Sequence, residues 1–367
     1  MRIGIDIREL EKNKKTGMGR YLINFLNYIN QFEHENEYIL FANTDSRIPS
    51  LRSDIRIKVI LEFSTIYWDQ IILKNEIKKE KIDIFYSPFY KGPVFSLAKL
   101  IVTCHDLHFL NLDSKAIGDF LRRYYCRKIL QESDTIITVS EYSKKEIVKF
   151  LGDKTKRVEV VYDSVTDEFR PLDKKACFDK VRRSFGLRED FILYVGNLKP
   201  HKNLARLINA YDLLPSSLKQ KYQLVIVGRK DETYQQLRKL VDQKELTNNV
   251  EFLGLVEDEY LIDLYNTASI LVLVSLCEGF GLPALEAMAC GTPTIVSDIT
   301  SLPEIVGDIG VLVDPRDTNL IASKLKHLLT DTSSREILSR KGLLRAKNFS
   351  VENMARKILK IFKESSG

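Results

Sequence analysis

Short apolar runs alternate with segments of helical periodicity from one end of the chain to the other. The runs are rich in Val, Ile and Leu, which is typical of strands in a buried parallel sheet. The strands predicted in the first half are Arg2–Ile7, Tyr38–Ala42, Arg56–Leu61, Ile82–Tyr86, Leu100–Cys104, Thr135–Val139 and Val158–Val161. The pattern restarts with Phe191–Val195, Gln223–Val227, Val250–Leu253, Ile270–Val274, Thr294–Ser297 and Gly310–Val313.

Helices are predicted between these strands, where apolar residues recur every three or four positions. In the first half they cover Gly19–Gln31, Trp68–Lys79, Gly118–Glu132 and Glu141–Leu151. In the second half they include Leu204–Leu214, Thr233–Glu245, Asp258–Thr267 and Ala284–Cys290. A last helix covers Ser350–Lys363, and Ser350 is placed to cap its first turn.

A break in this pattern divides the chain. Phe169–Asp173 fits neither period, and the charged segment Lys174–Arg183 follows it, so we interpret this stretch as a linker. A chain of 367 residues is also too long for one ordinary core. Because strands alternate with helices, we predict an α/β fold class with two Rossmann-like, doubly wound parallel-sheet domains. The predicted domains are residues 1–170 and 171–349, with a cleft between their strand ends.

The composition is that of a soluble globular protein, with 44% hydrophobic and 29% charged residues. The net charge of +6 is mild for this length. Residues 1–170 hold 28 of the 56 Lys and Arg and 25 of the 50 Asp and Glu, so the rest of the chain holds the same numbers. Neither half therefore has a domain-wide basic surface, and we expect no nucleic-acid partner.

The five cysteines are scattered and form no Cys-x-x-Cys pair, which favours reduced thiols. The N-terminus lacks the apolar segment of a signal peptide, and no apolar run reaches the roughly 18 residues of a membrane span. We expect a cytoplasmic protein.

An acidic and glycine-rich turn is the most informative stretch. Glu278-Gly279-Phe280-Gly281-Leu282-Pro283 follows an apolar strand, and Glu286 comes eight residues after Glu278. Pro283 suits the first turn of a helix, where its missing N–H costs nothing. The amides of Phe280, Gly281 and Leu282 then lie at a helix start, which favours an anion such as a diphosphate. Two carboxylates beside an anion site suit a ligand that is both phosphorylated and rich in hydroxyls.

This turn resembles the paired-glutamate motif of the large retaining glycosyltransferase family of GT-B fold, known as glycosyltransferase family 4 or "group 1". The resemblance spans nearly the whole chain and is strongest over residues 191–305. It implies a retaining hexosyltransferase without a cofactor, in which Glu286 binds the ribose and Glu278 contacts the transferred sugar. It also implies that the last helix, about residues 350–365, packs back on the first domain. A purely structural interpretation would instead have Glu286 cap the helix and Glu278 lie in solvent.

A second strand-end turn, Gly196 to Leu204, carries a cation before a helix, which suits phosphate binding. The resemblance implies that Lys202 contacts the diphosphate and offsets charge on the leaving phosphate without metal. No Asp-x-Asp follows a strand, which agrees with a metal-independent enzyme. The family often has a second cation where this chain has Asn197, so Lys199 or Arg229 is left to supply it.

Two further turns follow strands of the first half. Gly17 and Gly19 allow a backbone to approach a ligand closely, and they resemble the family's glycine loop beside the sugar and the leaving phosphate. His105 ends another strand, and the family's His-Asp at this point implies a contact with the sugar. A flexible turn and a structural histidine are the alternatives. In the second half, Leu255 and Val256 are expected to line the nucleobase.

The implied donor is a GDP-, UDP- or dTDP-sugar, and the acceptor is a glycan or a lipid-linked saccharide. The turn variants are most similar to bacterial mannosyl- or rhamnosyl-type enzymes of surface polysaccharide synthesis, although UDP-glucose fits as well. The alternatives are a sugar-nucleotide 2-epimerase and a non-catalytic nucleotide-sugar-binding protein. The cationic, aromatic segment 121–130 is either a solvated helix face or a peripheral contact with the inner face of the cell membrane.

Overall fold

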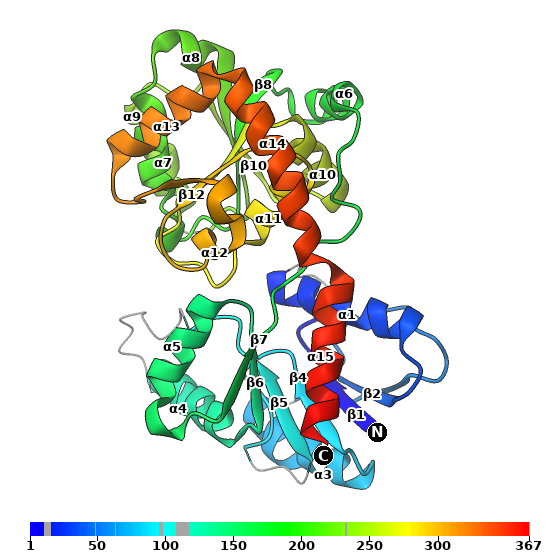
Figure 1. Ribbon diagram of the computed structural model, residues 1–367. Helices are drawn as coiled ribbons and strands as arrows, with labels where there is room; N and C mark the ends of the chain where they lie inside the picture. The colour runs from blue at the N-terminus through cyan, green and yellow to red at the C-terminus, as the bar shows by residue number, and fades with distance from the viewer. Residues whose placement is uncertain are drawn as a thin grey trace. The chain divides into compact units, whose positions relative to one another are not determined.

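Figure 1 shows a computed structural model of the chain, which describes residues 1–10, 16–47, 49–62, 64–94, 98–107, 117–231 and 233–366. The side chains of residues 117–122 lie outside this description. The chain forms two compact units, Met1–Ser164 with Ser350–Gly367, and Val165–Phe349. The division falls a few residues before the expected boundary at residue 170, and the last helix groups with the first unit.

The described part of the first unit contains a seven-stranded sheet in which every neighbouring pair is parallel. Its strands are β1 (Arg2–Asp6), β2 (Glu37–Ala42), β3 (Arg56–Val59), β4 (Ile84–Ser87), β5 (Lys99–Thr103), β6 (Thr135–Thr138) and β7 (Arg157–Val160). Their order is β3-β2-β1-β4-β5-β6-β7. The order reverses between β1 and β4, as in a doubly wound sheet.

Helices cover both faces of this sheet. They are α1 (Gly17–Phe32), α2 (Thr65–Tyr67), the π-helix η1 (Trp68–Leu73), α3 (Lys74–Lys79), α4 (Ile117–Glu132), α5 (Glu141–Leu151), η3 (Gly152–Lys154) and α15 (Val351–Ser365). One core joins η1, α3, α4 and α5 to alternate strand residues such as Phe85. On the opposite face, Phe362 of α15 packs its ring against Phe25 of α1 and Tyr86 of β4. In Figure 1, α15 is the red helix beside α1.

The second unit repeats this design. Its described residues form a six-stranded parallel sheet of order β10-β9-β8-β11-β12-β13. The strands are β8 (Asp190–Val195), β9 (Tyr222–Val227), β10 (Val250–Gly254), β11 (Ile270–Leu273), β12 (Thr294–Ser297) and β13 (Val311–Val313). The order reverses between β8 and β11. The predicted fold class, two doubly wound parallel sheets, is thus confirmed.

The helices of the second unit are more numerous than the periodicity predicted. They are α6 (Lys174–Phe185), η4 (Pro200–Lys202), α7 (Leu204–Asp212), α8 (Ser216–Lys221), α9 (Tyr234–Gln243), α10 (Asp258–Thr267), α11 (Leu282–Ala289), α12 (Leu302–Val306), η5 (Gly307–Ile309), α13 (Thr318–Thr330), α14 (Thr332–Ala346) and η6 (Lys347–Phe349). The interpretation of Lys174–Arg183 as a linker is wrong. This segment is α6, capped by Asp173, and it buries Cys177 and Val181 against the unit.

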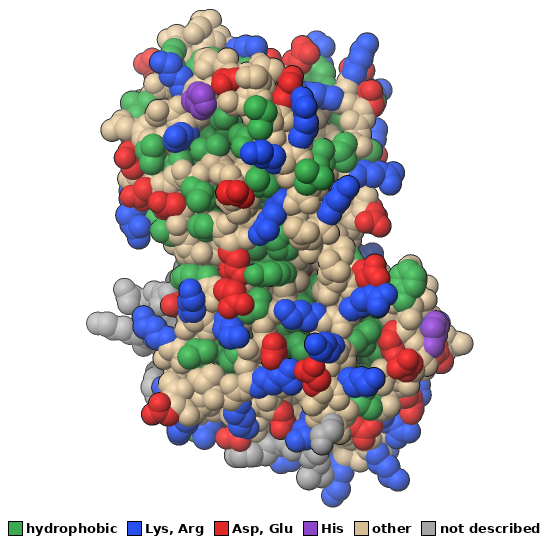
Figure 2. All heavy atoms as spheres, in the orientation of Figure 1, with side chains coloured by type: hydrophobic (Ala, Val, Ile, Leu, Met, Phe, Trp, Pro, Cys, Tyr) green, Lys and Arg blue, Asp and Glu red, His purple; other side chains and the backbone are tan. Residues whose placement is uncertain are grey.

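Charges of both signs are interspersed over the visible face of each unit (Figure 2), in line with the even distribution along the sequence. All five cysteines are free thiols. Within the described ranges, no helix is long and apolar enough to cross a membrane.

Candidate functional site

The predicted residues of the second unit lie on loops at the carboxyl edge of its sheet. Lys202 follows β8 and Glu278 follows β11, and these two strands pair directly with each other. They flank the point at which the strand order reverses. In doubly wound sheets the loops separate at this point and leave a crevice for a ligand. The topology therefore brings together two motifs that are far apart in the sequence.

Lys202 and Glu278 form a partly buried ion pair. The Lys202 Nζ lies 2.6 Å from Glu278 Oε1, and the two side chains are only 13% and 10% exposed. Ser275 Oγ donates to the same carboxylate oxygen at 2.8 Å. The Leu276 amide donates to the His201 carbonyl at 2.7 Å and ties the two loops together. Each charged group is thus held where the other neutralises it.

Asn203 fixes the Lys202 turn. Its backbone is left-handed, with φ 63°, a conformation that Asn adopts more readily than most residues. The buried side chain donates from Nδ2 to the carbonyls of Val274 at 2.9 Å and Pro315 at 2.7 Å. These bonds anchor the loop after β8 to the end of β11. Asn203 therefore holds in place the turn that carries the neighbouring Lys202.

The acidic and glycine-rich turn is held by sterics and by one hydroxyl. Gly281 caps α11 with φ 113°, and a Cβ there would lie 2.5 Å from Leu302 Cδ2, so only glycine fits. The Ser301 Oγ lies 3.0 Å from the Glu278 carbonyl and 2.8 Å from the Phe280 carbonyl, and it is fully buried. The first amides of α11 consequently face the carboxyl edge at a fixed place. Pro283 occupies the first turn of α11, as predicted.

Glu286 is the fifth residue of α11, one turn beyond the amides at the helix start. It is 3% exposed, and its Oε2 accepts a hydrogen bond of 2.7 Å from the hydroxyl of Tyr265. Glu286 therefore does not cap α11, whose N-cap is Gly281, and Glu278 is not solvated, since its side chain is 10% exposed. The Glu286 carboxylate is held inside the unit next to the turn that carries Glu278.

The remaining predicted site residues of the second unit lie along the same edge of the sheet, on the loops after β8, β9 and β10. Asn197 is exposed after β8, and its carbonyl accepts a bond of 2.8 Å from Tyr194. Arg229 is exposed after β9 and, within the described ranges, makes no ion pair. Leu255, 76% exposed, and the half-buried Val256 follow β10. Since β10, β9 and β8 are neighbours, these loops form one row that leads to Lys202.

The first unit places its predicted residues around one aromatic contact. Gly17 and Gly19 form the first turn of α1, where the Gly19 amide donates to the Thr16 hydroxyl at 2.9 Å. One turn later, Tyr21 meets the ring of His105 edge-on, with 5.0 Å between centroids. His105 follows β5, two strands from β1. The glycine turn and His105 are thus brought together at the carboxyl edge of the first sheet.

His105 is a neutral hydrogen-bonding group. Burial lowers its pKa to about 4, against the weaker raising effects of Asp106 and the Pro88 carbonyl. Its Nε2 lies 3.1 Å from the Pro88 oxygen. A carbonyl only accepts, so Nε2 carries the hydrogen and Nδ1 has acceptor character. Nearby, Ser140 caps α5 by accepting from the Ser143 amide.

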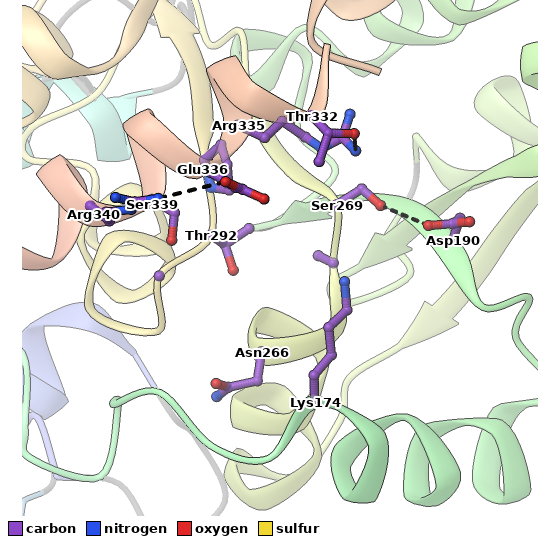
Figure 3. A pocket seen from close by; sticks show the side chains of 13 residues that line it. Lys174, Asp190, Asn266, Ser269, Thr292, Thr332, Arg335, Glu336, Ser339 and Arg340 are labelled. Atoms are coloured by element: carbon purple, nitrogen blue, oxygen red, sulfur yellow. Dashed lines mark hydrogen bonds and ion pairs between the residues drawn. The ribbon is translucent and has the colours of Figure 1, made fainter. Parts of the chain in front are cut away.

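A pocket of about 350 Å³ lies at the opposite edge of the second sheet (Figure 3). Its walls include Asp190 at the start of β8 and Ser269 and Pro293 just before β11 and β12. None of the residues predicted from sequence lines it. The pocket is therefore separate from the row of loops at the carboxyl edge. In the described part of the chain, no three His, Cys, Asp or Glu side chains group as metal ligands.

Ser275, Ser301, Asn203 and Tyr265 support the predicted residues and were not identified from the sequence. Asn203 stands directly after Lys202, so the Lys-Asn pair is a local signal for it. The other three gave no such signal, because common residues support the site from other loops or helices.

Comparison with known proteins agrees with this arrangement. Residues 15–169 match Glycosyltransferase Family 4, and residues 178–345 match Glycosyl transferases group 1. Two such units, with an acidic and glycine-rich turn and a lysine at the reversal point of the second sheet, define a glycosyltransferase of GT-B fold. The chain belongs to the group 1 family of these enzymes.

Individual relatives extend this result. O-antigen chain mannosyltransferase B of Escherichia coli is 34% identical over 282 residues, which cover 75% of this chain and 74% of that protein. Serotype-specific mannosyltransferase WbdA of Escherichia coli is 33% identical over 263 residues, 70% of this chain but 32% of WbdA. The structure of Anabaena Alr3699/HepE in complex with UDP and glucose has a TM-score of 0.79 at 18% identity, covering 99% of this chain and 100% of that one.

Proposed function

We propose that this protein transfers a hexosyl unit from a nucleotide diphosphate sugar to a glycan or lipid-linked acceptor, with retention of configuration and without a metal ion. The observation that carries the proposal is the Lys202–Glu278 pair beside the first amides of α11, at the reversal point of the second sheet. A cation and a helix start together suit a diphosphate. The neighbouring carboxylates suit the hydroxyls of a sugar and a ribose.

The diphosphate binds across Gly281 and Leu282, and Lys202 leaves Glu278 to meet it. The exchange replaces one anionic partner of Lys202 by another, so the cation is never left unpaired. Glu278 is released at the same time and becomes an acceptor for the hydroxyls of the sugar. The ion pair thus supports the proposal that Lys202 and Glu278 bind the same ligand.

The nucleoside lies along the row of loops after β8, β9 and β10. Glu286 accepts hydrogen bonds from the ribose, and Leu255 and Val256 contact the base. The second cation is Arg229 or Lys199, both of which are exposed on loops at this edge. On the first unit, His105 and the glycine turn of Gly17 and Gly19 contact the sugar.

Retention follows, by family resemblance, from attack on the face that the leaving group departs from. The bond between the anomeric carbon and the β-phosphate oxygen breaks, and its electron pair remains on the phosphate. The acceptor oxygen bonds to the anomeric carbon, and its proton passes to the leaving phosphate. Lys202 and the α11 amides stabilise the charge that develops on that phosphate.

The relatives indicate which donor and acceptor to test first. Two of them are named as mannosyltransferases, one of them of the O-antigen chain. We therefore propose a mannosyl donor and a role in surface polysaccharide synthesis. UDP-glucose is the second candidate donor, because the Alr3699/HepE structure contains UDP and glucose.

The test is a donor panel with and without a saccharide acceptor. GDP-mannose, UDP-glucose and dTDP-rhamnose are incubated with the protein and a lipid-linked oligosaccharide, and nucleoside diphosphate release is measured together with product mass. Release that depends on the acceptor supports a transferase. Turnover of the donor without acceptor indicates an epimerase, and binding without turnover indicates a non-catalytic protein.

Peripheral membrane contact through α4 is part of the proposal. Ile129 and Leu130 are buried, whereas Tyr124 is 52% exposed and Arg127 is exposed beside it. This face combines an aromatic ring with cations, which suits an anionic lipid surface at the inner face of the cell membrane. Co-sedimentation with vesicles containing phosphatidylglycerol tests it. Binding that Tyr124→Ser and Arg127→Ser do not reduce would contradict this role for α4.

A further inference from the structure

Glu286 has a buried partner that the family motif does not contain. The hydroxyl of Tyr265, in the last turn of α10, donates to Glu286 Oε2 at 2.7 Å. Tyr265 is fully buried, and Glu286 is 3% exposed. A bond between a neutral hydroxyl and a carboxylate in such surroundings is stronger than a neutral one and is little screened by water.

Tyr265 is itself rigidly held. Its ring packs edge-on against Phe169, with 6.0 Å between centroids. Its carbonyl accepts a hydrogen bond from the Thr292 hydroxyl. Thr292 is 4% exposed and lies on the wall of the pocket in Figure 3, behind the site. The tyrosine is thus held at its ring by Phe169 and at its backbone by Thr292.

A glutamate side chain needs such support to be specific. The torsion that turns its carboxylate plane is broad and has no sharp preference. A fixed donor on one oxygen sets that plane and so determines where the lone pairs of both oxygens point. Ligand hydroxyls are then recognised by angle as well as by distance. In other sites too, residues that hydrogen-bond to a ligand-binding group fix its orientation.

We infer that Tyr265 is a positioning residue that orients Glu286 and thereby sets the preference of this protein for a ribose-containing nucleotide. The inference rests on the proposed function, in which Glu286 binds the ribose. Tyr265 touches no ligand atom and acts through Glu286. Its loss weakens recognition of the ribose hydroxyls and leaves the diphosphate contacts of Lys202 unchanged.

The test compares ribose and deoxyribose ligands by calorimetry. The probes are GDP and UDP with their 2′-deoxy and 3′-deoxy analogues. In the wild type we expect the ribose form to bind about tenfold more tightly, the effect of one or two charge-assisted hydrogen bonds. Tyr265→Phe should reduce that ratio to about threefold or less, chiefly by weakening the ribose form.

Tyr211→Phe is the matched control. Tyr211 is also fully buried in the second unit, and its hydroxyl donates to the Tyr222 carbonyl at 2.6 Å. Both variants lose one buried tyrosine hydroxyl bond, but only one of them affects Glu286. Tyr211→Phe should keep the wild-type ratio. Thr292→Val, which removes the bond to the Tyr265 carbonyl, should lower the ratio by a smaller factor and provides a second variant if Tyr265→Phe is unstable.

A double-mutant cycle with Glu286→Gln distinguishes positioning from a general structural effect. If Tyr265 acts through Glu286, adding Tyr265→Phe to Glu286→Gln should leave the ratio unchanged, because the coupled group is already lost. The inference is overturned if adding Tyr265→Phe to Glu286→Gln lowers the ribose-to-deoxyribose affinity ratio as much as it does in the wild type. It is also overturned if Tyr265→Phe alone keeps the wild-type ratio. If the wild type binds no nucleoside diphosphate, or Glu286→Gln keeps the full ratio, the proposed function or its Glu286 role fails, and the inference fails with it.

Discussion

Lys202 and Glu278 form an ion pair with each other in the second unit. The ion pair is 2.6 Å long and lies in a part of the unit with little solvent. In the proposed function, a diphosphate therefore competes with Glu278 for the lysine.

Lys202→Ala should lower turnover by about ten- to a thousandfold, as expected when a stabiliser of leaving-group charge is lost. Steady-state release of nucleoside diphosphate measures the effect. Lys174→Ala is a suitable control, because Lys174 is exposed at the opposite edge of the second sheet. Turnover of the Lys202 variant within twofold of wild type would show that another group takes the charge.

The two glutamates should separate binding from turnover. Glu286→Gln weakens binding of a nucleoside diphosphate by roughly 1–3 kcal/mol, because an amide replaces a charge-assisted acceptor. Glu278→Gln leaves that binding equal or tighter, since Lys202 loses its competitor, and instead lowers kcat. Calorimetric titration of each variant with a nucleoside diphosphate that carries no sugar tests these two roles. The opposite pattern would exchange the two roles.

His105 should make the fold sensitive to acid. Its pKa is about 4 in the folded chain and about 6.5 in an unfolded one, so below pH 6.5 the unfolded state binds more protons. Stability is therefore lost as the pH falls from 6.5 toward 4, by about 2–3 kcal/mol at pH 4.5. Denaturant titrations at pH 7 and pH 4.5 measure the loss.

His105→Gln keeps a donor for the Pro88 carbonyl and removes the titrating group, so the acid-dependent loss should be smaller in this variant. His327→Gln, at an exposed position of α13, should retain the wild-type difference. An unchanged acid sensitivity in His105→Gln would mean that other groups carry it.

Single residues could be named as site candidates where a local motif marked them. Lys202, Glu278 and Glu286 stand in short turns with glycine or proline, and the structure brings the first two into contact. Tyr265 and Ser301 were missed, because they reach the site from another helix and another loop, 21 and 23 residues from their partners. A serine or a tyrosine in an ordinary segment gives no sign of the carboxylate or carbonyl that it will meet.

At the scale of elements, the start of α11 depends on one glycine. Gly281→Ala should destabilise the unit by about 1–3 kcal/mol and lower donor affinity, because the residue has a positive φ and its new Cβ would clash with Leu302. Gly186→Ala is the control, since Gly186 also has a positive φ but no atom within 4 Å of its Cβ position. Thermal unfolding of both variants isolates the clash. Equal losses would show that φ alone matters.

Elements were predicted well where apolar periodicity is strong and poorly where it is weak. The strands of both sheets lie within a few residues of their predicted bounds, because each is a continuous apolar run. Lys174–Phe185 was assigned to a linker, because its two buried residues are outnumbered by exposed charges. Trp68–Lys79 was predicted as one helix, but a π-helical turn occupies its first half. The spacing of hydrophobic residues does not reveal the hydrogen-bond pattern of a π-helix, so this turn could not be predicted.

At the scale of the whole molecule, activity should survive chelation. The developing phosphate charge is assigned to Lys202 and the α11 amides, so the proposed reaction needs no cation from solution. Turnover in 5–10 mM EDTA (roughly a thousandfold above trace metal) should stay within twofold of the untreated rate. Loss of activity that magnesium or manganese restores would contradict the metal-independent proposal.

The return of α15 to the first unit makes that unit discontinuous in the chain. Val165–Phe349 is in effect an insertion, and its two ends meet where the Val165 amide donates to the Phe349 carbonyl. During synthesis, the ring cluster of Phe25, Tyr86 and Phe362 cannot be completed until the entire second unit has been made. Of the two units, the one whose chain is started earlier is thus finished later, and until then it exposes an apolar face that a chaperone could recognise.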